Sequence, residues 1–555
     1  MRREFAVDRR QFLVRSLAGV AGVAVGALLT ACGEQGESSA VGSTAPRPTP
    51  SPTATPTPAT PVGTGPGTVS TPEARMPELR VALPSMPPQL DPQRAWWLVM
   101  QRVYGMVYNQ LIRRDWSRNG QFVPGLARSW RRVDETTIEF ELRDDVLFHD
   151  GNLMTAEDVA FTFERTLQGD KELGATGRFP IAEVQVVDRH LIRFVTDGPD
   201  GAFEHRLTKH EASIVPKAYF ERVGAQEFQR QPVGTGPYRV VEFVPDQQIV
   251  LEAHEEYFEG RPPADRVTVV AIPEVGTRIA ALLNGEIDIL IDLPPDQVSV
   301  VEQAGRFRVD SFAPLNANYL IVNGLKPPTD KVEVRQALSL AIDRRAIVEQ
   351  LLGGHGLVPG SVQSVLDPLY VERPPLPYDP ERARQLLAQA GYAGEEITFL
   401  FDSPPYYPMH REWVELMASM WRAVGLNVTL HGVEVSQRVE LQRPDTPYHL
   451  INNSTGVEVD IVLYQSYGPN SLHQKLFPPG HFDDFNRILD QARITVDNRE
   501  RAQLYQQALD IMNERVMALI QFTINRLQAM PDHILIGVDP EFRLDLSPRN
   551  FQVRA

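Results

Sequence analysis

The sequence is poor in cysteine, in basic residues and in long apolar runs, and each shortage argues against one kind of structure or partner. Cys32 is the one cysteine among 555 residues, so no disulfide can form within the chain. The 71 acidic residues outnumber the 55 lysines and arginines, and the net charge of −16 argues against nucleic acid as a partner, because phosphate binding needs clustered cations. The apolar stretch at residues 17–29 is shorter than the ~20 residues of a membrane-spanning helix.

The beginning of the chain has the pattern of an export signal. Arginines at positions 2, 3, 9 and 10 precede the apolar stretch, which predicts a removable signal peptide over residues 1–31. Residues 8–13 (Asp-Arg-Arg-Gln-Phe-Leu) are similar to a twin-arginine export signal, and an ordinary basic segment is the alternative. Residues 29–32 (Leu-Thr-Ala-Cys) resemble the lipobox of bacterial lipoproteins. We therefore expect Cys32 to be lipidated and to hold the protein at the membrane without a spanning helix.

The next segment, residues 32–75, is rich in proline, threonine and serine and has almost nothing apolar to bury. A tract of this composition is extended and semi-rigid, so it predicts a tether between the lipid and a folded part.

The folded part, from residue 76 onward, mixes strand and helix patterns. Residues 79–83 and 138–142 alternate apolar and other side chains, which predicts half-buried strands. Helices are predicted by their starts, at Asp343, Asp379 and Asp497, and at residues 155–158, which resemble a capping box. Short strands separated by helices of ten to fifteen residues favour an α/β fold. We see no long linker in this part, so any two lobes must share crossing strands.

Several stretches in this region are similar to one family, the extracytoplasmic solute-binding proteins of the oligopeptide and dipeptide importer class, family 5. Their order and number make the resemblance specific. The matching stretches are residues 90–92 (Leu-Asp-Pro), 124–130 (Pro-Gly-Leu-Ala-Arg-Ser-Trp), 138–146, 148–151 (Phe-His-Asp-Gly), 155–159, 233–238 (Val-Gly-Thr-Gly-Pro-Tyr), 334–338, 341–344, 378–381 and 390–392.

The resemblance implies an α/β, two-lobed periplasmic-binding-protein-like (type II) fold with a hinge of crossing strands. Lobe 1 would comprise residues 76–318 and 520–555, with an inserted subdomain at about 122–232, and lobe 2 residues 319–519. The implied function is the capture of peptides or similar small solutes between the lobes for the permease subunits of an ABC importer. The protein would work as a monomer outside the cytoplasm, in the periplasm or on the outer face of the cell membrane.

The family's peptide binders place an acidic residue of the second lobe opposite the ligand's free amine. Aligning residues 448–450 with the strand before that acid puts Glu458 at its position, with Asp460 as second candidate. The family's Gly-Trp pair before the acid is replaced here by Ser454 and Thr455, and Thr455 is a further candidate contact. The alternative interpretation is that Glu458 and Asp460 are solvated loop acids.

Aromatic side chains are the other expected cleft feature, because flat apolar surfaces hold varied ligands. The candidates are Trp96, Trp97, Tyr406, Tyr407 and Tyr464, and core packing is the alternative for each. Arg344 could pair with a ligand carboxylate, but we expect it on a solvated helix face.

Two rival functions are a lipid-anchored extracellular hydrolase and a sensor that reports a solute to a membrane receptor. We find no nucleophile elbow, zinc-protease helix or phosphate loop, and His149 and Asp150 fall within an Asp-Gly turn. We therefore expect a protein that is not an enzyme and that uses no cofactor and no metal.

Overall fold

The computed structural model describes one compact unit within Ser70–Ala555. No helix in the described part of the chain is long and apolar enough to cross a membrane. The described residues are 75–94, 98–118, 120–167, 179–403, 408–434, 437, 441–456, 458–469, 471–537, 539–541 and 543–554.

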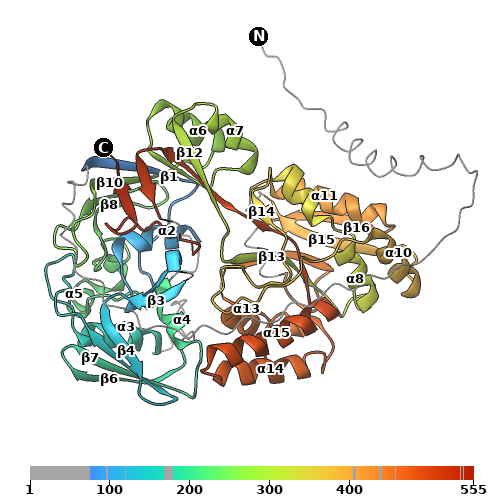
Figure 1. The fold of residues 1–555 in the computed structure, drawn as a ribbon, viewed down its shortest axis with the longest axis horizontal. Helices are drawn as coiled ribbons and strands as arrows, with labels where there is room; N and C mark the ends of the chain where they lie inside the picture. The colour runs from blue at the N-terminus through green and yellow to red at the C-terminus, as the bar shows by residue number, and fades with distance from the viewer. Residues whose placement is uncertain are drawn as a thin grey trace, which may run out of the picture. The chain divides into compact units, whose positions relative to one another are not determined.

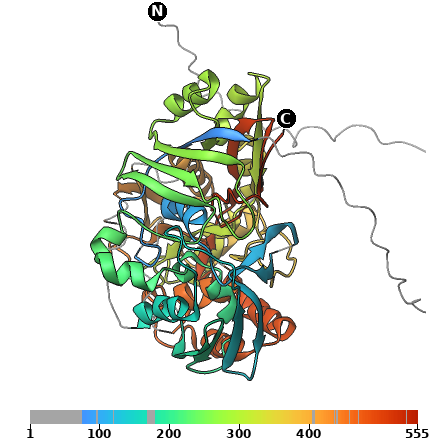
Figure 2. The same cartoon turned by 90° about the vertical axis from the view of Figure 1, so that its left-hand side faces the viewer.

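A seven-stranded mixed sheet forms the centre of lobe 1, and the blue strand β1 lies beside the green strands of this sheet in Figure 2. β1 pairs in parallel with both β10 and β11, while β20 runs antiparallel between β11 and β12. In sheet order the strands are β12 (Phe307–Phe312), β20 (Arg526–Pro531), β11 (Ile289–Ile291), β1 (Met76–Leu83), β10 (Ala264–Ala271), β9 (Gln248–Ala253) and β8 (Tyr238–Val244). The predicted strand at residues 79–83 is therefore confirmed, but it is buried on both faces rather than half-buried.

Both faces of this sheet are covered. One face packs on α2 (Leu98–Val107) and the C-terminal hairpin of β21 (Ile534–Ile536) and β22 (Phe551–Val553). The other face packs on α6 (Val275–Asn284) and α7 (Val298–Glu302). Two covered faces explain why β1 and β10 are rich in valine and leucine rather than strictly alternating.

A four-stranded antiparallel sheet forms a further layer of lobe 1, in the order β4 (Ala127–Arg132), β5 (Thr137–Leu142), β7 (Leu191–Thr196), β6 (Ile181–Asp188). A phenylalanine cluster of Phe140, Phe163 and Phe194 fills the space beneath it. The accompanying elements are the β2 (Ile112–Asp115) and β3 (Gln121–Pro124) hairpin and the helices α3 (Ala156–Leu167), α4 (Phe203–Leu207) and α5 (Lys217–Phe228).

The motifs of the sequence hold this layer together. Thr155 donates its backbone N–H and its hydroxyl to the Asp158 carboxylate, which confirms a capping interaction at the start of α3. His149 lies 3.0 Å from the carbonyl of Gly236, which packs so tightly on the α2 end that a Cβ there would lie 2.4 Å from the Val107 carbonyl carbon. These residues are therefore structural.

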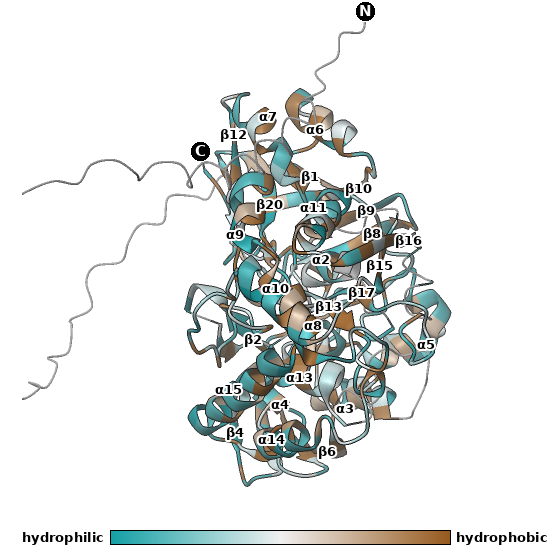
Figure 3. Ribbon diagram, turned by 90° about the vertical axis from the view of Figure 1, so that its right-hand side faces the viewer, coloured by the Kyte–Doolittle hydropathy of each residue, from teal (hydrophilic) through white to brown (hydrophobic). Residues whose placement is uncertain are grey.

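A five-stranded sheet forms lobe 2, in the order β16 (Asn427–Val433), β15 (Glu396–Asp402), β17 (Leu450–Gly456), β13 (Asn316–Val322), β18 (Ala518–Ile520). Asp343, Asp379 and Asp497 each accept a backbone N–H at a helix start, as predicted. The helices are α8 (Val332–Leu340), α9 (Arg344–Ala346) with a π turn (Ile347–Leu351), α10 (Pro380–Gln389), α11 (His410–Ala423), α13 (Val459–Tyr467), α14 (Asp483–Ile494) and α15 (Asn498–Arg515). Figure 3 shows hydrophilic residues along the visible side of α15, while Leu504, Tyr505, Ala508 and Met512 of this helix are buried.

In the described part of the chain, two short segments connect the large sheets. Residues 313–315 lead from β12 to β13, and residues 521–525 lead from β18 back to β20, as Figure 1 shows near the label β14. The second segment contains β19 (Thr523–Ile524), which pairs with β14 (Gly356–Leu357). The two lobes are thus joined by crossings of three and five residues.

The expectation that Arg344 lies on a solvated helix face is wrong. Its side chain is buried and donates to the carbonyls of Ser339, Ile520 and Gln521. Since α9 begins against β18, the guanidinium is enclosed and satisfies the carbonyls at the end of that strand.

Candidate functional site

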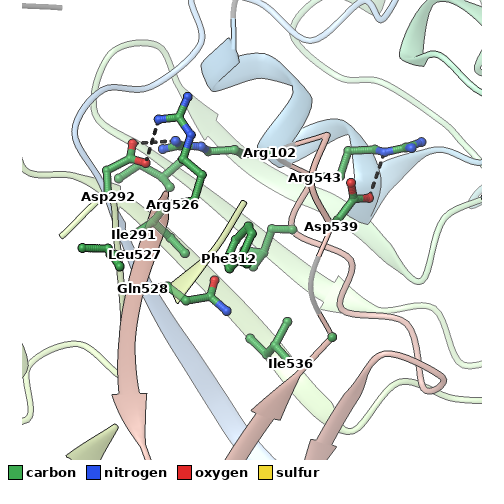
Figure 4. Close-up of a pocket in the computed structure, with 13 residues that line it drawn as sticks. Arg102, Ile291, Asp292, Phe312, Arg526, Leu527, Gln528, Ile536, Asp539 and Arg543 are labelled. Atoms are coloured by element: carbon green, nitrogen blue, oxygen red, sulfur yellow. Dashed lines mark hydrogen bonds and ion pairs between the residues drawn. The ribbon is translucent and has the colours of Figure 1, made fainter. Parts of the chain in front are cut away.

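A hollow lies in lobe 1, where the crossing segments join the end of β12 and the start of β20 (Figure 4). It encloses about 490 Å³ of atom-free space, part of it open to solvent. Its walls combine charged side chains with apolar surface from Phe312 and Ile536, a mixture typical of small-solute sites. The lining residues are Leu83, Arg102, Ile291, Asp292, Phe312, Arg526, Leu527, Gln528, Ile536, Gly537, Asp539, Arg543 and Leu544.

One carboxylate and two guanidiniums face each other in this hollow. The Asp292 carboxylate lies 2.5 Å from Arg102 Nη2 and 3.6 Å from Arg526 Nη1. Burial raises the pKa of Asp292, but Arg102 and Arg526 outweigh it, and the net pKa is below the ordinary value. Asp292 also has a positive φ of 57°, a strained backbone conformation of the kind that clusters at ligand sites.

A second hollow of about 330 Å³ adjoins the first and shares Asp292, Arg526 and Leu527 with it. Its other wall comes from lobe 2, where Asn316 and Asn318 on β13 line it. The Oδ1 atoms of both asparagines are buried and accept no hydrogen bond within the described residues. A buried acceptor without a donor is unfavourable, so these two oxygens are suited to receive donors from a bound solute.

Glu458 joins the lobes through a buried ion cluster, which is linked to the first hollow by the ion pair of Glu541 with the lining residue Arg543. Glu458 lies at the start of α13 in lobe 2, and its Oε1 is 2.9 Å from both Arg114 Nη2 and Lys209 Nζ of lobe 1. Lys209 Nζ is also 2.7 Å from Glu458 Oε2 and 2.8 Å from Glu541 Oε1. The side chains of Glu458 and Arg114 are fully buried.

The cations dominate the electrostatics of Glu458. Burial alone raises the pKa of this carboxyl, but the charges of Lys209 and Arg114 outweigh burial and lower the pKa far below its usual range. Burial likewise lowers the pKa of Lys209, and Glu458 and Glu541 raise it above the ordinary lysine value. Glu458 and Lys209 are therefore both charged at neutral pH.

Asp460 lies two residues after Glu458, in the first turn of α13, and is buried as well. Its carboxylate lies 3.3 Å from Arg501 Nε and 3.8 Å from the His205 ring, and burial raises its pKa against the opposing charge of Arg501. The alternative that Glu458 and Asp460 are solvated loop acids is thus wrong.

A third acid, Asp367, holds the start of α13. Its carboxylate accepts the backbone N–H groups of Val459 at 2.5 Å and Leu369 at 2.7 Å. Burial raises the pKa of Asp367 to about 7, despite the hydrogen bond from Val459.

Most of the predicted aromatic contacts fall outside the described residues. This applies to Trp96, Trp97, Tyr406 and Tyr407, and to the predicted lipidation site Cys32. Their roles stay predictions.

Two predicted contacts lie in described elements of lobe 2. Thr455 lies in β17, where it pairs with Ala317. Tyr464 is half-buried on α13, and its hydroxyl accepts a hydrogen bond from Arg493 Nη1 at 2.9 Å. Contact of either residue with a solute stays a prediction.

Sequence reasoning missed the cationic partners. Lys209 and Glu458 are 249 positions apart, and Arg102 and Asp292 are 190 apart. None of these cations belongs to a motif. The sequence could indicate only that an acid, if buried, requires a cationic partner, and not which residue provides it.

The comparisons with known proteins agree on one family. Residues 121–469 match the model of the middle part of bacterial extracellular solute-binding proteins, family 5. The chain is 30% identical to Heme-binding protein A of Haemophilus influenzae, covering 74% of this chain and 80% of that protein. It is 28% identical to Di/tripeptide-binding protein 1 of Pseudomonas aeruginosa, covering 74% and 82%.

Solved structures show the same fold at lower identity. The periplasmic binding protein DppA from Helicobacter pylori, solved with the peptide STSA, superposes with a TM-score of 0.73 at 22% identity, covering 87% of this chain and 99% of that one. NikA from Brucella suis, solved with Fe(III)-EDTA, superposes with a TM-score of 0.78 at 21% identity, covering 86% and 100%. The chain has two α/β lobes and matches the family model over residues 121–469, more than half of its length. It therefore belongs to the bacterial extracellular solute-binding proteins of family 5.

Proposed function

We propose that the protein captures a small solute, first of all a peptide, between its two lobes and delivers it to the permease subunits of an ABC importer. The observation that carries this proposal is the pair of adjoining hollows, whose walls come from lobe 1 on one side and from β13 of lobe 2 on the other. Ligand sites favour such interfaces, because closure of the lobes surrounds the solute.

The chemistry of the hollows suits a peptide. Arg102, Arg526 and Asp292 offer both signs of charge, while the Oδ1 atoms of Asn316 and Asn318 can accept amide N–H groups. Phe312 and Ile536 provide apolar surface for side chains. The names of relatives such as the Di/tripeptide-binding proteins support the same solute class.

In the proposed mechanism, the protein does no chemistry on its solute. The crossing segments 313–315 and 521–525 act as the hinge, and the solute's higher affinity for the closed arrangement shifts the lobes toward closure. Contact of Trp96, Trp97, Tyr406 and Tyr407 with the solute, predicted from the sequence, belongs to the same proposal and concerns residues outside the described part of the chain.

We further propose that residues 1–31 are a signal peptide and that lipidated Cys32 and the tether to residue 75 keep a monomeric protein at the outer side of the cell membrane. The division into lobes predicted from the sequence, 76–318 with 520–555 and 319–519, belongs to the same proposal, with its boundaries moved by a few residues to the crossings at 313–315 and 521–525.

Small-angle scattering and native mass spectrometry test the function together. Mass spectrometry of the protein purified from its own host should detect a bound small molecule, which should also be recovered unchanged after incubation. Saturation with this molecule should reduce the radius of gyration. A solute that is bound without compaction would contradict the hinge, and a solute that is converted to product would support the hydrolase.

A further inference from the structure

The ion cluster between the lobes consists of Glu458, Lys209, Arg114 and Glu541, which we call the Glu458 cluster. Only Glu458 belongs to lobe 2, so the complete cluster exists only when the lobes are in contact. The side chains of Glu458 and Arg114 are 0% exposed, those of Glu541 and Lys209 7% and 15%. Water therefore contributes little to balancing these charges.

Within this cluster the charges balance. Two cations face two carboxylates, and each Glu458 oxygen has a cationic nitrogen within 2.9 Å. Glu541 is also paired with Arg543, whose Nε lies 3.1 Å from Asp539, so this extension adds one more charge of each sign. A second ammonium brought by a solute would meet no unbalanced carboxylate here, and burying it would be unfavourable.

Lys209 is held in position by lobe 1. It lies between α4 and the short helix at His210–Ala212, and its backbone N–H donates to the Arg206 carbonyl at 3.1 Å. The salt bridge to Glu541 at 2.8 Å directs the ammonium toward lobe 2. Closure therefore delivers this ammonium to Glu458 without any contribution from a solute.

We propose that Lys209 supplies from within the chain the cation that Glu458 needs on closure, so that the solute is selected without a free amine at this position. Given the proposed function, on which this inference rests, the accepted class includes peptides with a blocked N-terminus and other solutes that lack an ammonium. Lys209 is then a residue that determines specificity, and Glu458 is a contact between lobes.

The first experiment compares binding of Ala-Ala-Ala and N-acetyl-Ala-Ala-Ala to the full chain by calorimetry. We expect the wild type to bind both within about threefold. In Lys209→Met the closed form keeps Arg114 but buries one negative charge in excess, so binding of the acetylated peptide should weaken about tenfold or more, and the preference should shift toward the free amine. Lys217→Met, whose exposed ammonium is 3.5 Å from Glu157, is the control and should behave as wild type.

The second experiment needs no peptide. Lys209→Ala leaves a cavity beside an unbalanced charge, so propylammonium chloride should raise its melting temperature by about 2 °C or more relative to sodium chloride. The wild type and Lys217→Ala should show no such difference.

The outcomes separate the two proposals. A wild type that prefers the free amine tenfold or more, or a Lys209→Ala variant that does not respond to propylammonium, overturns the role of Lys209 while peptide binding stands. A propylammonium response without binding of either peptide supports the role of Lys209 and contradicts the tripeptides as solutes.

Discussion

At the scale of single residues, Gly201 marks a point where the lobes touch. Its N–H donates to the Arg493 carbonyl of lobe 2 at 3.0 Å, and a Cβ at this position would lie 2.2 Å from both the Thr495 carbonyl oxygen and Arg501 Nη1. Gly201→Ala should therefore hinder closure and weaken binding of the native solute about tenfold or more in calorimetry. In Gly198→Ala the new methyl group would meet no atom within 4 Å, so this control should bind normally, and equal affinities in both variants would contradict the contact.

Asp367 gives a prediction about pH at the same scale. Its pKa is about 7 in the folded protein and is ordinary in the unfolded chain, so the folded state holds an extra proton between about pH 4 and pH 7. Asp367 therefore makes stability fall as pH rises through this window, by at most about 1.4 kcal/mol per pH unit.

In Asp367→Asn this contribution is absent. Urea titrations at several pH values measure the free energy of unfolding of both proteins. The value for the variant minus the value for the wild type should increase as pH rises from 4 to 7. A constant difference between the two proteins would show that the carboxyl titrates normally.

At the scale of secondary-structure elements, Arg344 connects α9 to the end of β18. Its guanidinium donates to the Ile520 carbonyl at 2.7 Å and to the Gln521 carbonyl at 3.0 Å. Arg344→Gln would leave these carbonyls without a donor and should lower the free energy of unfolding by about 2–4 kcal/mol. The neighbouring exposed Arg345 provides the control, because Arg345→Gln should change stability by less than about 0.5 kcal/mol. Similar losses in both variants would contradict the role of Arg344.

The sequence predicted the secondary-structure elements, and helix starts in particular, better than it predicted contacts between distant residues. Caps such as Asp343, Asp379 and Asp497 act on residues two or three positions away, so a local pattern was sufficient to predict them. The side of the helix that Arg344 occupies depends on β18, about 175 residues later, and its burial could not be predicted. The partners of Glu458 were hidden for the same reason, since they lie 249 and more positions away on another lobe.

At the scale of the whole molecule, buried histidines should make the protein sensitive to acid. Burial lowers the pKa of His149 to about 3 and that of His473 to about 4, and burial together with Arg114 lowers that of His205 well below its ordinary value. The unfolded chain takes up protons below about pH 6.5 that the folded protein does not, so these groups make stability fall as pH falls.

Buried Asp367 acts in the opposite direction, because it makes stability rise as pH falls. A double variant therefore isolates the contribution of the histidines. His149→Gln with His473→Gln should reduce the loss of melting temperature between pH 6.5 and pH 4.5 relative to the wild type, since two of the groups no longer titrate. Parallel pH profiles for the two proteins would show that these histidines are protonated in the folded state.

The order of strands in lobe 1 has a consequence for biosynthesis. β20 lies between β11 and β12 in the seven-stranded sheet, yet it follows all of lobe 2 in the chain. A ribosome that has finished residues 76–312 has therefore produced a sheet with a missing interior strand, and the facing edges of β11 and β12 stay unpaired until residues 526–531 emerge. During this interval the open strand edges favour aggregation, so lobe 1 depends on the completion of its neighbour.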